Sequence, residues 1–90
     1  MLTERPANQH IFYVGSGQQF KHAITHGDSV TLKSGDQFVL IRKVHLRQPH
    51  GFTGEIYGFD PSGAEEYAGM KVGARIEFSE RDVYGCSSPT

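Results

Sequence analysis

The chain has 90 residues, of which 37% are hydrophobic and 21% charged, and its formal net charge is −1. This length accommodates one core and excludes two independent ones, while the aromatic and aliphatic content excludes wholesale disorder. A net charge this close to zero gives no general attraction to phosphate backbones. We expect a single domain over 1–90, with a loose lead-in at 1–10 and a frayed tail at 87–90.

The sequence also predicts where the protein acts. The longest apolar run, residues 38–41, is too short to span a membrane, and residues 1–10 lack the apolar stretch of a secretory signal. The single cysteine, Cys86, excludes an internal disulfide and fits a reducing compartment. We therefore expect a cytoplasmic protein that does not enter a membrane.

The first element in chain order is a short strand. Residues 11–14 are aromatic and β-branched, and they stop at Gly15. Ser16 followed by Gln19 then matches a capping box, which predicts a two-turn helix near 17–25. A loop is the alternative interpretation of this second segment.

A three-strand meander is predicted over 30–59. Residues 30–33 and 37–46 flank the turn Ser34-Gly35-Asp36, which is typical of a β-hairpin. After a break at 48–51, residues 52–59 form the next strand. Its Gly54 and Gly58 indicate bulges or sites of close backbone approach.

The last third of the chain contains a turn, a helical turn and a strand. Ser62 and Glu65 match a second capping box and predict one helical turn at 64–68. Apolar and polar residues alternate over 72–78, as in a strand with one buried face. Residues 82–85 are predicted to form a last short strand.

The stretch Met70-Lys71-Val72-Gly73-Ala74-Arg75-Ile76-Glu77-Phe78 resembles a hairpin of SH3-like barrels. In those barrels a turn with a glycine leads into a strand of alternating apolar residues. The resemblance covers roughly 52–85, and Ala74 stands where an aspartate usually follows the glycine. It implies a fold and no activity.

Together these patterns predict a mainly β (β-rich α+β) fold with one or two short helices. The architecture is a small antiparallel SH3-like barrel or a strongly curved meander. Alternation within each strand selects the residues expected in the core: Ile11, Val30, Leu32, Leu40, Val44, Ile56, Ile76 and Phe78.

The residue types that carry catalysis or bind metals are sparse. His22 and His26 have helical metal-ligand spacing, but no third ligand of the right kind is near in sequence, so we expect no metal and no cofactor. Cys86 lies beside a polar tail and is interpreted as a packed or idle thiol. P-loop and nucleophile-elbow patterns are absent from the sequence. The chain is therefore predicted not to be an enzyme, with a small enzyme as the least favoured alternative.

Charge asymmetry is the one informative functional pattern. Residues 1–50 carry a net charge of +3 (six Lys/Arg, three Asp/Glu), whereas residues 51–90 carry −4 (three Lys/Arg, seven Asp/Glu). Basic residues on one predicted strand neighbour aromatic residues on the next. The candidate binding residues are Arg42, Lys43, His45, Arg47, Tyr57 and Phe59. Strict alternation would place Lys43, His45 and Arg47 on one face and Arg42 on the other with Leu40, Val44 and Leu46.

A dipolar surface of this kind fits a protein partner, or self-association into a homodimer. The predicted function is a non-enzymatic binding module that acts as an adaptor, an inhibitor or an immunity-type protein. The alternative is a protein that binds single-stranded or structured nucleic acid through the same basic and aromatic residues.

Overall fold

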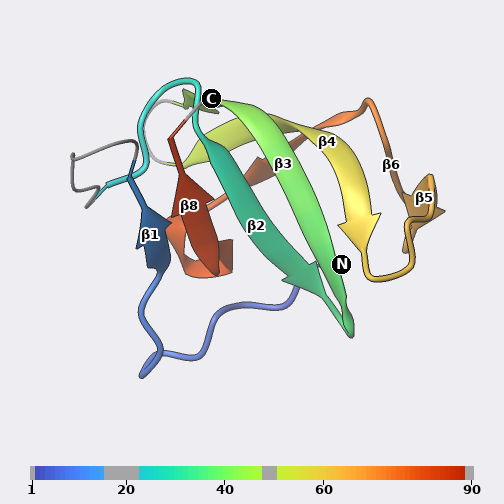
Figure 1. The fold of residues 1–90 in the computed structure, drawn as a ribbon, viewed down its shortest axis with the longest axis horizontal. Coiled ribbons are helices and arrows are strands. Elements are labelled where there is room, and N and C mark those ends of the chain that lie inside the picture. The colour runs from blue at the N-terminus through green and yellow to red at the C-terminus, as the bar shows by residue number, and fades with distance from the viewer. Residues whose placement is uncertain (1, 16–22, 48–50, 89–90) are drawn as a thin grey trace.

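A computed structural model describes residues 2–15, 23–47 and 51–88. These residues form a six-stranded mixed sheet in the order β1-β8-β2-β3-β4-β7 (Figure 1). The strands are β1 (Phe12–Val14), β2 (Ser29–Ser34), β3 (Gln37–Leu46), β4 (Phe52–Asp60), β7 (Arg75–Phe78) and β8 (Gly85–Ser87). A two-stranded sheet of β5 (Glu66–Tyr67) and β6 (Met70–Lys71) projects from the loop between β4 and β7, and a 3₁₀ helix, η1 (Glu80–Asp82), precedes β8.

The predicted meander is confirmed. Strands β2 and β3 pair antiparallel from Val30–Ile41 to Ser34–Gln37, so Gly35 and Asp36 form a two-residue hairpin loop. Gly35 has φ +59°, a conformation that suits the tight turn and disfavours other residues. Strand β4 then pairs antiparallel with β3, and β7 with β4. The fold class is therefore mainly β.

The predicted closed, antiparallel barrel is not observed in the described residues. The sheet ends at β1 on one side and at β7 on the other, and β1 pairs parallel with β8. Between β7 and β8 the chain forms η1, whose Ser79 and Asp82 make a capping box, instead of continuing the ladder.

The predicted helices also require correction. Most of the segment 17–25 lies outside the described residues. The helical turn expected at 64–68 is instead part of the β5–β6 hairpin, in which Tyr67 pairs with Met70. Ala68 and Gly69 have φ +51° and +81°, so the backbone takes a left-handed hairpin turn that a right-handed helix excludes.

The ends of the chain contact the sheet. The Thr3 amide donates to the Lys33 carbonyl at 2.7 Å, and the Arg5 amide donates to the Arg81 carbonyl at 2.8 Å. Tyr84 Oη lies 2.8 Å from the Glu4 carbonyl oxygen. At the other end Ser87 belongs to β8, while residues 89–90 lie outside the described part.

The core lies against the inner face of the sheet. Of the residues predicted for it, Val30, Leu32, Val44, Ile56 and Phe78 are buried. Ile11 and Ile76 are partly buried and pack against this core, whereas Leu40 is partly buried on the outer face of the sheet. The core also takes residues that alternation did not select: Ile24, Val39, Ile41, Phe59, Val83 and Cys86.

Two β-bulges explain the differences on β3 and β4. Leu40 pairs with Gly58 and Ile41 with Ile56, which makes Tyr57 an extra residue on β4. Further along, Arg42 pairs with Glu55 and His45 with Thr53, so β3 has an extra residue at Lys43–Val44. Each extra residue reverses which side chains face the core beyond it.

Candidate functional site

Arg42 and Tyr57 meet on the outer face of the sheet, opposite the core. The Arg42 guanidinium carbon lies 5.9 Å from the centre of the Tyr57 ring. Arg42 Nε also donates to Glu55 Oε1 at 2.6 Å. Arg42 is exposed, which corrects its expected place beside Val44 on the core face; the bulge after it turns Val44 inward and leaves Arg42 outside.

Lys43, His45 and Arg47 follow at the bulged end of β3, and all three are exposed. Lys43 has φ +55°, and its carbonyl accepts a hydrogen bond from Arg75 Nη2 at 3.3 Å. Arg75 Nη2 also lies 3.2 Å from Thr53 Oγ1. The predicted basic strand therefore gains a further cation, Arg75 of β7, which lies beside the bulge.

The neighbours of His45 and Arg47 reduce the positive charge that these two side chains contribute. The His45 ring packs edge-on against His26, with ring centres 4.2 Å apart. Partial desolvation, the adjacent His26 and the charge of Arg75 together lower the pKa of His45, which favours the neutral ring. Arg47 Nε lies 3.2 Å from Glu77 Oε1, so its charge is partly neutralised by an exposed carboxylate.

Phe59 does not belong to this surface. Its side chain is 3% exposed, and its ring lies 6.1 Å from that of Tyr67. The prediction placed Phe59 with Tyr57 on one contact surface because both lie on the aromatic strand beside the basic one. The bulge at Tyr57 turns Phe59 into the core and leaves Tyr57 43% exposed.

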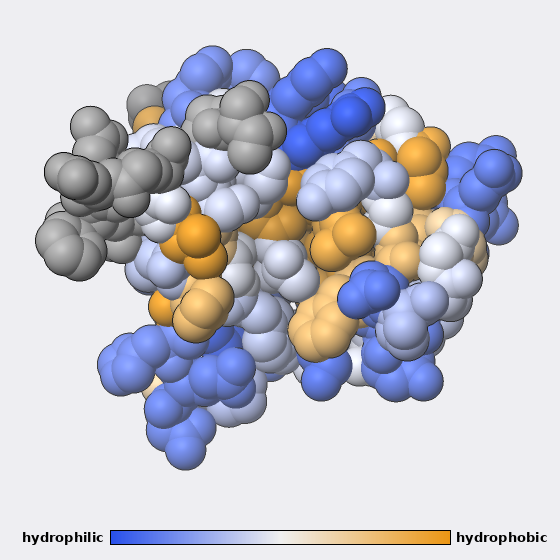
Figure 2. All heavy atoms as spheres, in the orientation of Figure 1, coloured by the Kyte–Doolittle hydropathy of each residue, from blue (hydrophilic) through white to orange (hydrophobic). Residues whose placement is uncertain are grey.

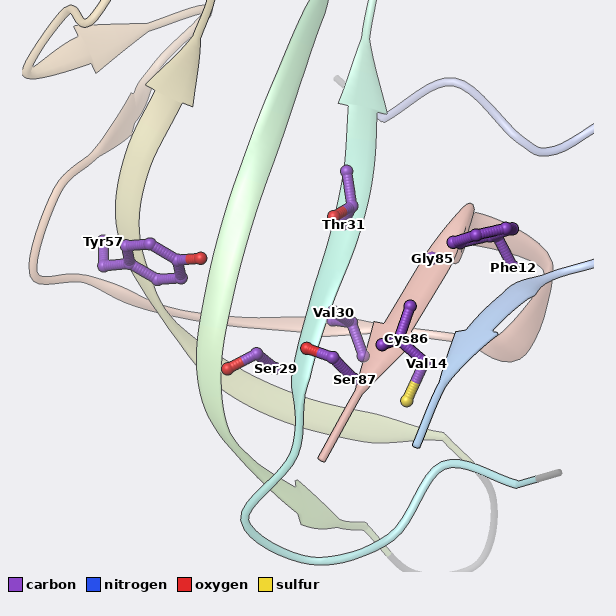
Figure 3. A pocket seen from close by; sticks show the side chains of 9 residues that line it. All are labelled: Phe12, Val14, Ser29, Val30, Thr31, Tyr57, Gly85, Cys86 and Ser87. Carbon is purple, nitrogen blue, oxygen red and sulfur yellow. The ribbon is translucent and has the colours of Figure 1, made fainter. Parts of the chain in front are cut away.

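A shallow hollow lies on the outer face next to Tyr57 and has a volume of about 160 Å³. Its floor is formed by small side chains of β2 and β8, because Thr31 pairs with Gly85 and Ser29 with Ser87. Phe12 and Val14 of β1 bound it on one side and Tyr57 of β4 on the other (Figure 3). We call these residues the outer-face groove: Phe12, Val14, Ser29, Thr31, Tyr57, Gly85 and Ser87.

The walls of the groove expose large apolar side chains. Phe12 is 73% exposed and Val14 is 46% exposed. Figure 2 shows hydrophobic side chains on both sides of a hollow in this face, and strongly hydrophilic residues toward the top and bottom of the view. An exposed apolar patch rimmed by polar residues is typical of a surface that contacts another molecule.

Sequence reasoning missed the β1 and β8 contributions to this groove. Ser29 and Thr31 alternate with buried residues, so their outward direction was available from the pattern. The parallel pairing of Phe12 with Gly85 was not available, because it joins strands more than 70 residues apart. Without that pairing, Phe12 and Val14 could not be placed beside Tyr57.

The described histidines are exposed, and the cysteine is buried. No group of three His, Cys, Asp or Glu side chains there is arranged to hold a metal, and His22 lies outside that part. Cys86 is buried, with its Sγ 3.4 Å from Asp28 Oδ2. No helix in the described ranges is long and apolar enough to cross a membrane.

Comparisons of the chain with protein-family models, with curated proteins and with solved structures find no match.

Proposed function

We propose that the protein is a small non-enzymatic binding module that contacts a protein partner through the outer-face groove. The observation that carries this proposal is the placement of three exposed apolar or aromatic side chains, Phe12, Val14 and Tyr57, around one hollow. Burying them against a partner would remove apolar area from water, which is the main driving force of association. Their β-strand positions keep them in place before binding.

The size and chemistry of the groove support a partner surface over an enclosed small molecule. Its volume of about 160 Å³ is below the roughly 300–1,000 Å³ of typical ligand pockets. Tyr and Arg are enriched among the residues that dominate interface energies, and Tyr57 and Arg42 stand together at its edge. The SH3-like resemblance and the cytoplasmic location stay predictions and add nothing to this argument.

Nucleic acid is the second candidate, favoured by the clustering of Lys43, Arg75 and the two histidines at the bulge. Against it, Arg42 and Arg47 are each paired with a glutamate, Glu55 and Glu77. Those carboxylates would repel a phosphate backbone that approached either arginine. Affinity for a single-stranded oligonucleotide that falls steeply with salt would favour this candidate over the protein partner.

The proposal is tested by comparing proteins captured from a nuclease-treated lysate by wild type and by variants. Phe12→Ser and Tyr57→Ser should each lose the same captured protein, with an affinity loss of about 30-fold. Val72→Ser is the matched control, because Val72 is a 41% exposed apolar residue outside the groove. Equal capture by wild type, both groove variants and the control would reject the groove as the contact surface.

A further inference from the structure

Positive charge is concentrated at one end of the outer-face groove. Arg42, Lys43 and Arg75 lie around the bulge of β3. In the part of the chain that the structure describes, the carboxylate of Glu55 lies among these three cations. Glu55 senses all three cations: its hydrogen bond from Arg42, and then the charges of Arg42, Lys43 and Arg75, lower its pKa. Three cations against one carboxylate leave an excess of positive charge, and we call these three cations the cationic rim.

The cationic rim is continuous with the groove. Val30, which lies beneath the groove, pairs with Ile41, the chain neighbour of Arg42, so the groove and the rim adjoin at this pair. The Arg42 guanidinium also lies over the ring of Tyr57, which forms the groove wall. A chain segment that filled the hollow would therefore reach the rim within one or two residues, since an extended chain advances about 3.3 Å per residue.

The hydrogen bonds made by the cationic rim leave N–H donors that could bind an anion. Arg42 uses Nε for Glu55, and Arg75 uses Nη2 for the Lys43 carbonyl and the Thr53 hydroxyl. Neither Lys43 nor Arg75 has an ion pair with a carboxylate among the described residues. A guanidinium has five N–H donors and an ammonium three, so both side chains keep the capacity to bind an anion.

We infer that the protein segment seated in the outer-face groove is acidic, and that it places a carboxylate on the cationic rim next to its apolar anchor. This inference rests on the proposed function and specifies the chemistry of its partner. A single carboxylate fits better than a phosphate backbone, because Glu55 and Glu77 confine the excess charge to one place. Arginine and carboxylate also match in geometry and form paired hydrogen bonds.

The probes are three synthetic hexapeptides with blocked ends. The first alternates leucine and serine and ends in glutamate; the second has glutamine in place of the glutamate. The third keeps the glutamate but has serine in place of every leucine. A hexapeptide in extended form covers about 20 Å, roughly the width of the four strand spacings between β1 and β4. Binding is followed by NMR through the backbone amides of Thr31, Tyr57 and Arg75.

We expect the glutamate peptide to bind about fivefold more tightly than its glutamine twin and to shift all three amides. The Lys43→Gln and Arg75→Gln variants should each show a smaller preference for the glutamate peptide, whereas Lys71→Gln, on the exposed β5–β6 hairpin, should keep the preference of the wild type. Lys43→Gln removes only a side-chain charge, so it tests the rim even if Arg75→Gln disturbs the bulge.

The outcomes separate the two levels of the proposal. If both leucine peptides bind the groove with equal affinity, the groove stands and the acidic partner is rejected. If the leucine peptides shift none of the groove amides, the proposed function fails and the inference fails with it. If the all-serine peptide binds as well as the leucine one, the apolar anchor plays no part and the proposed function fails. If an oligonucleotide of about six bases displaces the glutamate peptide at a lower concentration than free glutamate peptide does, the partner chemistry is wrong and nucleic acid is favoured.

Discussion

The two faces of the β2–β3–β4 meander carry opposite constraints. On the inner face Leu32, Val39, Ile41 and Ile56 are fully buried, and each position must be apolar and of the right size. On the outer face the same strands present Thr31, Leu40, Arg42 and Tyr57, which are exposed or half-buried. Packing therefore fixes the inner face, while the outer face is left free to serve a contact.

The bulges connect the two faces, because one extra residue moves side chains from one face to the other. At Tyr57 the bulge delivers an aromatic ring to the outer face and Phe59 to the core. At Lys43–Val44 it delivers Val44 to the core and leaves Arg42 and Lys43 outside. The same two irregularities thus complete the core and build the Arg42–Tyr57 edge of the groove.

The largest expected difference between the faces is in stability. Ile41→Ala removes a fully buried side chain, and we expect a loss of roughly 2–5 kcal/mol in the free energy of unfolding. Phe12→Ser on the outer face should change it by less than about 0.5 kcal/mol, because Phe12 is 73% exposed. Urea unfolding of both variants measures the contrast. Similar losses in the two would show that the outer face is packed as tightly as the inner one.

Local signals were enough to predict the meander. The turn Ser34-Gly35-Asp36 and the alternation around it determine a hairpin because both act over a few residues. The Lys43–Val44 bulge has no comparable signal, since neither residue is a glycine and an extra residue costs little in isolation. Packing of Val44 against the finished core decides its position, and that information is not local.

The candidate site, like the fold, could be predicted only where local sequence signals were sufficient. Arg42, Lys43, His45 and Tyr57 were predicted as candidates because basic and aromatic residues neighbour each other across a short turn. Arg75 was expected only as one residue on a solvated face. Its place at the bulge depends on the β4–β7 register, in which it pairs with Glu55. Long-range pairing thus determines which charges meet, and alternation within a strand does not.

A close approach between two strands gives the second test of the inner face. A Cβ added at Gly54 would clash with Ile41 Cγ2, which lies too close for any ordinary contact. Gly54→Ala should therefore cost about 1–3 kcal/mol through overpacking. In the double variant Gly54→Ala with Ile41→Ala, the clashing atom is gone.

We expect the double variant to be more stable than the sum of the two single losses predicts, by at least about 0.5 kcal/mol. Gly58→Ala is the control, because its added Cβ would meet Leu40 Cδ1 at an ordinary 3.5 Å. Strictly additive losses would mean that Gly54 matters for its backbone and not for the space beside Ile41.

A substitution at the bulge on β3 is expected to raise the stability of the fold, by less than the losses described above. Lys43 has φ +55°, a left-handed conformation that costs a non-glycine residue roughly 1–2 kcal/mol. Lys43→Gly should relieve this cost, offset in part by the greater freedom of glycine in the unfolded chain, for a net gain of about 0.5 kcal/mol. Lys43→Gln, which keeps the strain and removes the charge, separates backbone from electrostatics. A loss of stability in Lys43→Gly with none in Lys43→Gln would contradict the bulge geometry.

The smallest expected effect is the pH dependence that His45 confers on the outer face. Desolvation, His26 and Arg75 lower its pKa in the folded protein below the ordinary value of about 6.5. The unfolded chain therefore takes up a proton at His45 before the folded protein does. As the pH falls below about 6.5, this difference destabilises the fold, and above that pH it has no effect.

Urea unfolding at about pH 7.5 and about pH 5.5 should accordingly show a larger loss on acidification for wild type than for His45→Asn. Glu55 does not interfere in this window, because its pKa is lowered from an ordinary value of about 4.3 and it stays ionised at both pH values. His26→Asn should reduce the loss as well, since it removes a neighbour that disfavours the charged His45 ring. Identical losses in wild type and His45→Asn would show that the contact between the two rings does not persist in solution, and would leave Arg42, Lys43 and Arg75 as the charges that define this end of the groove.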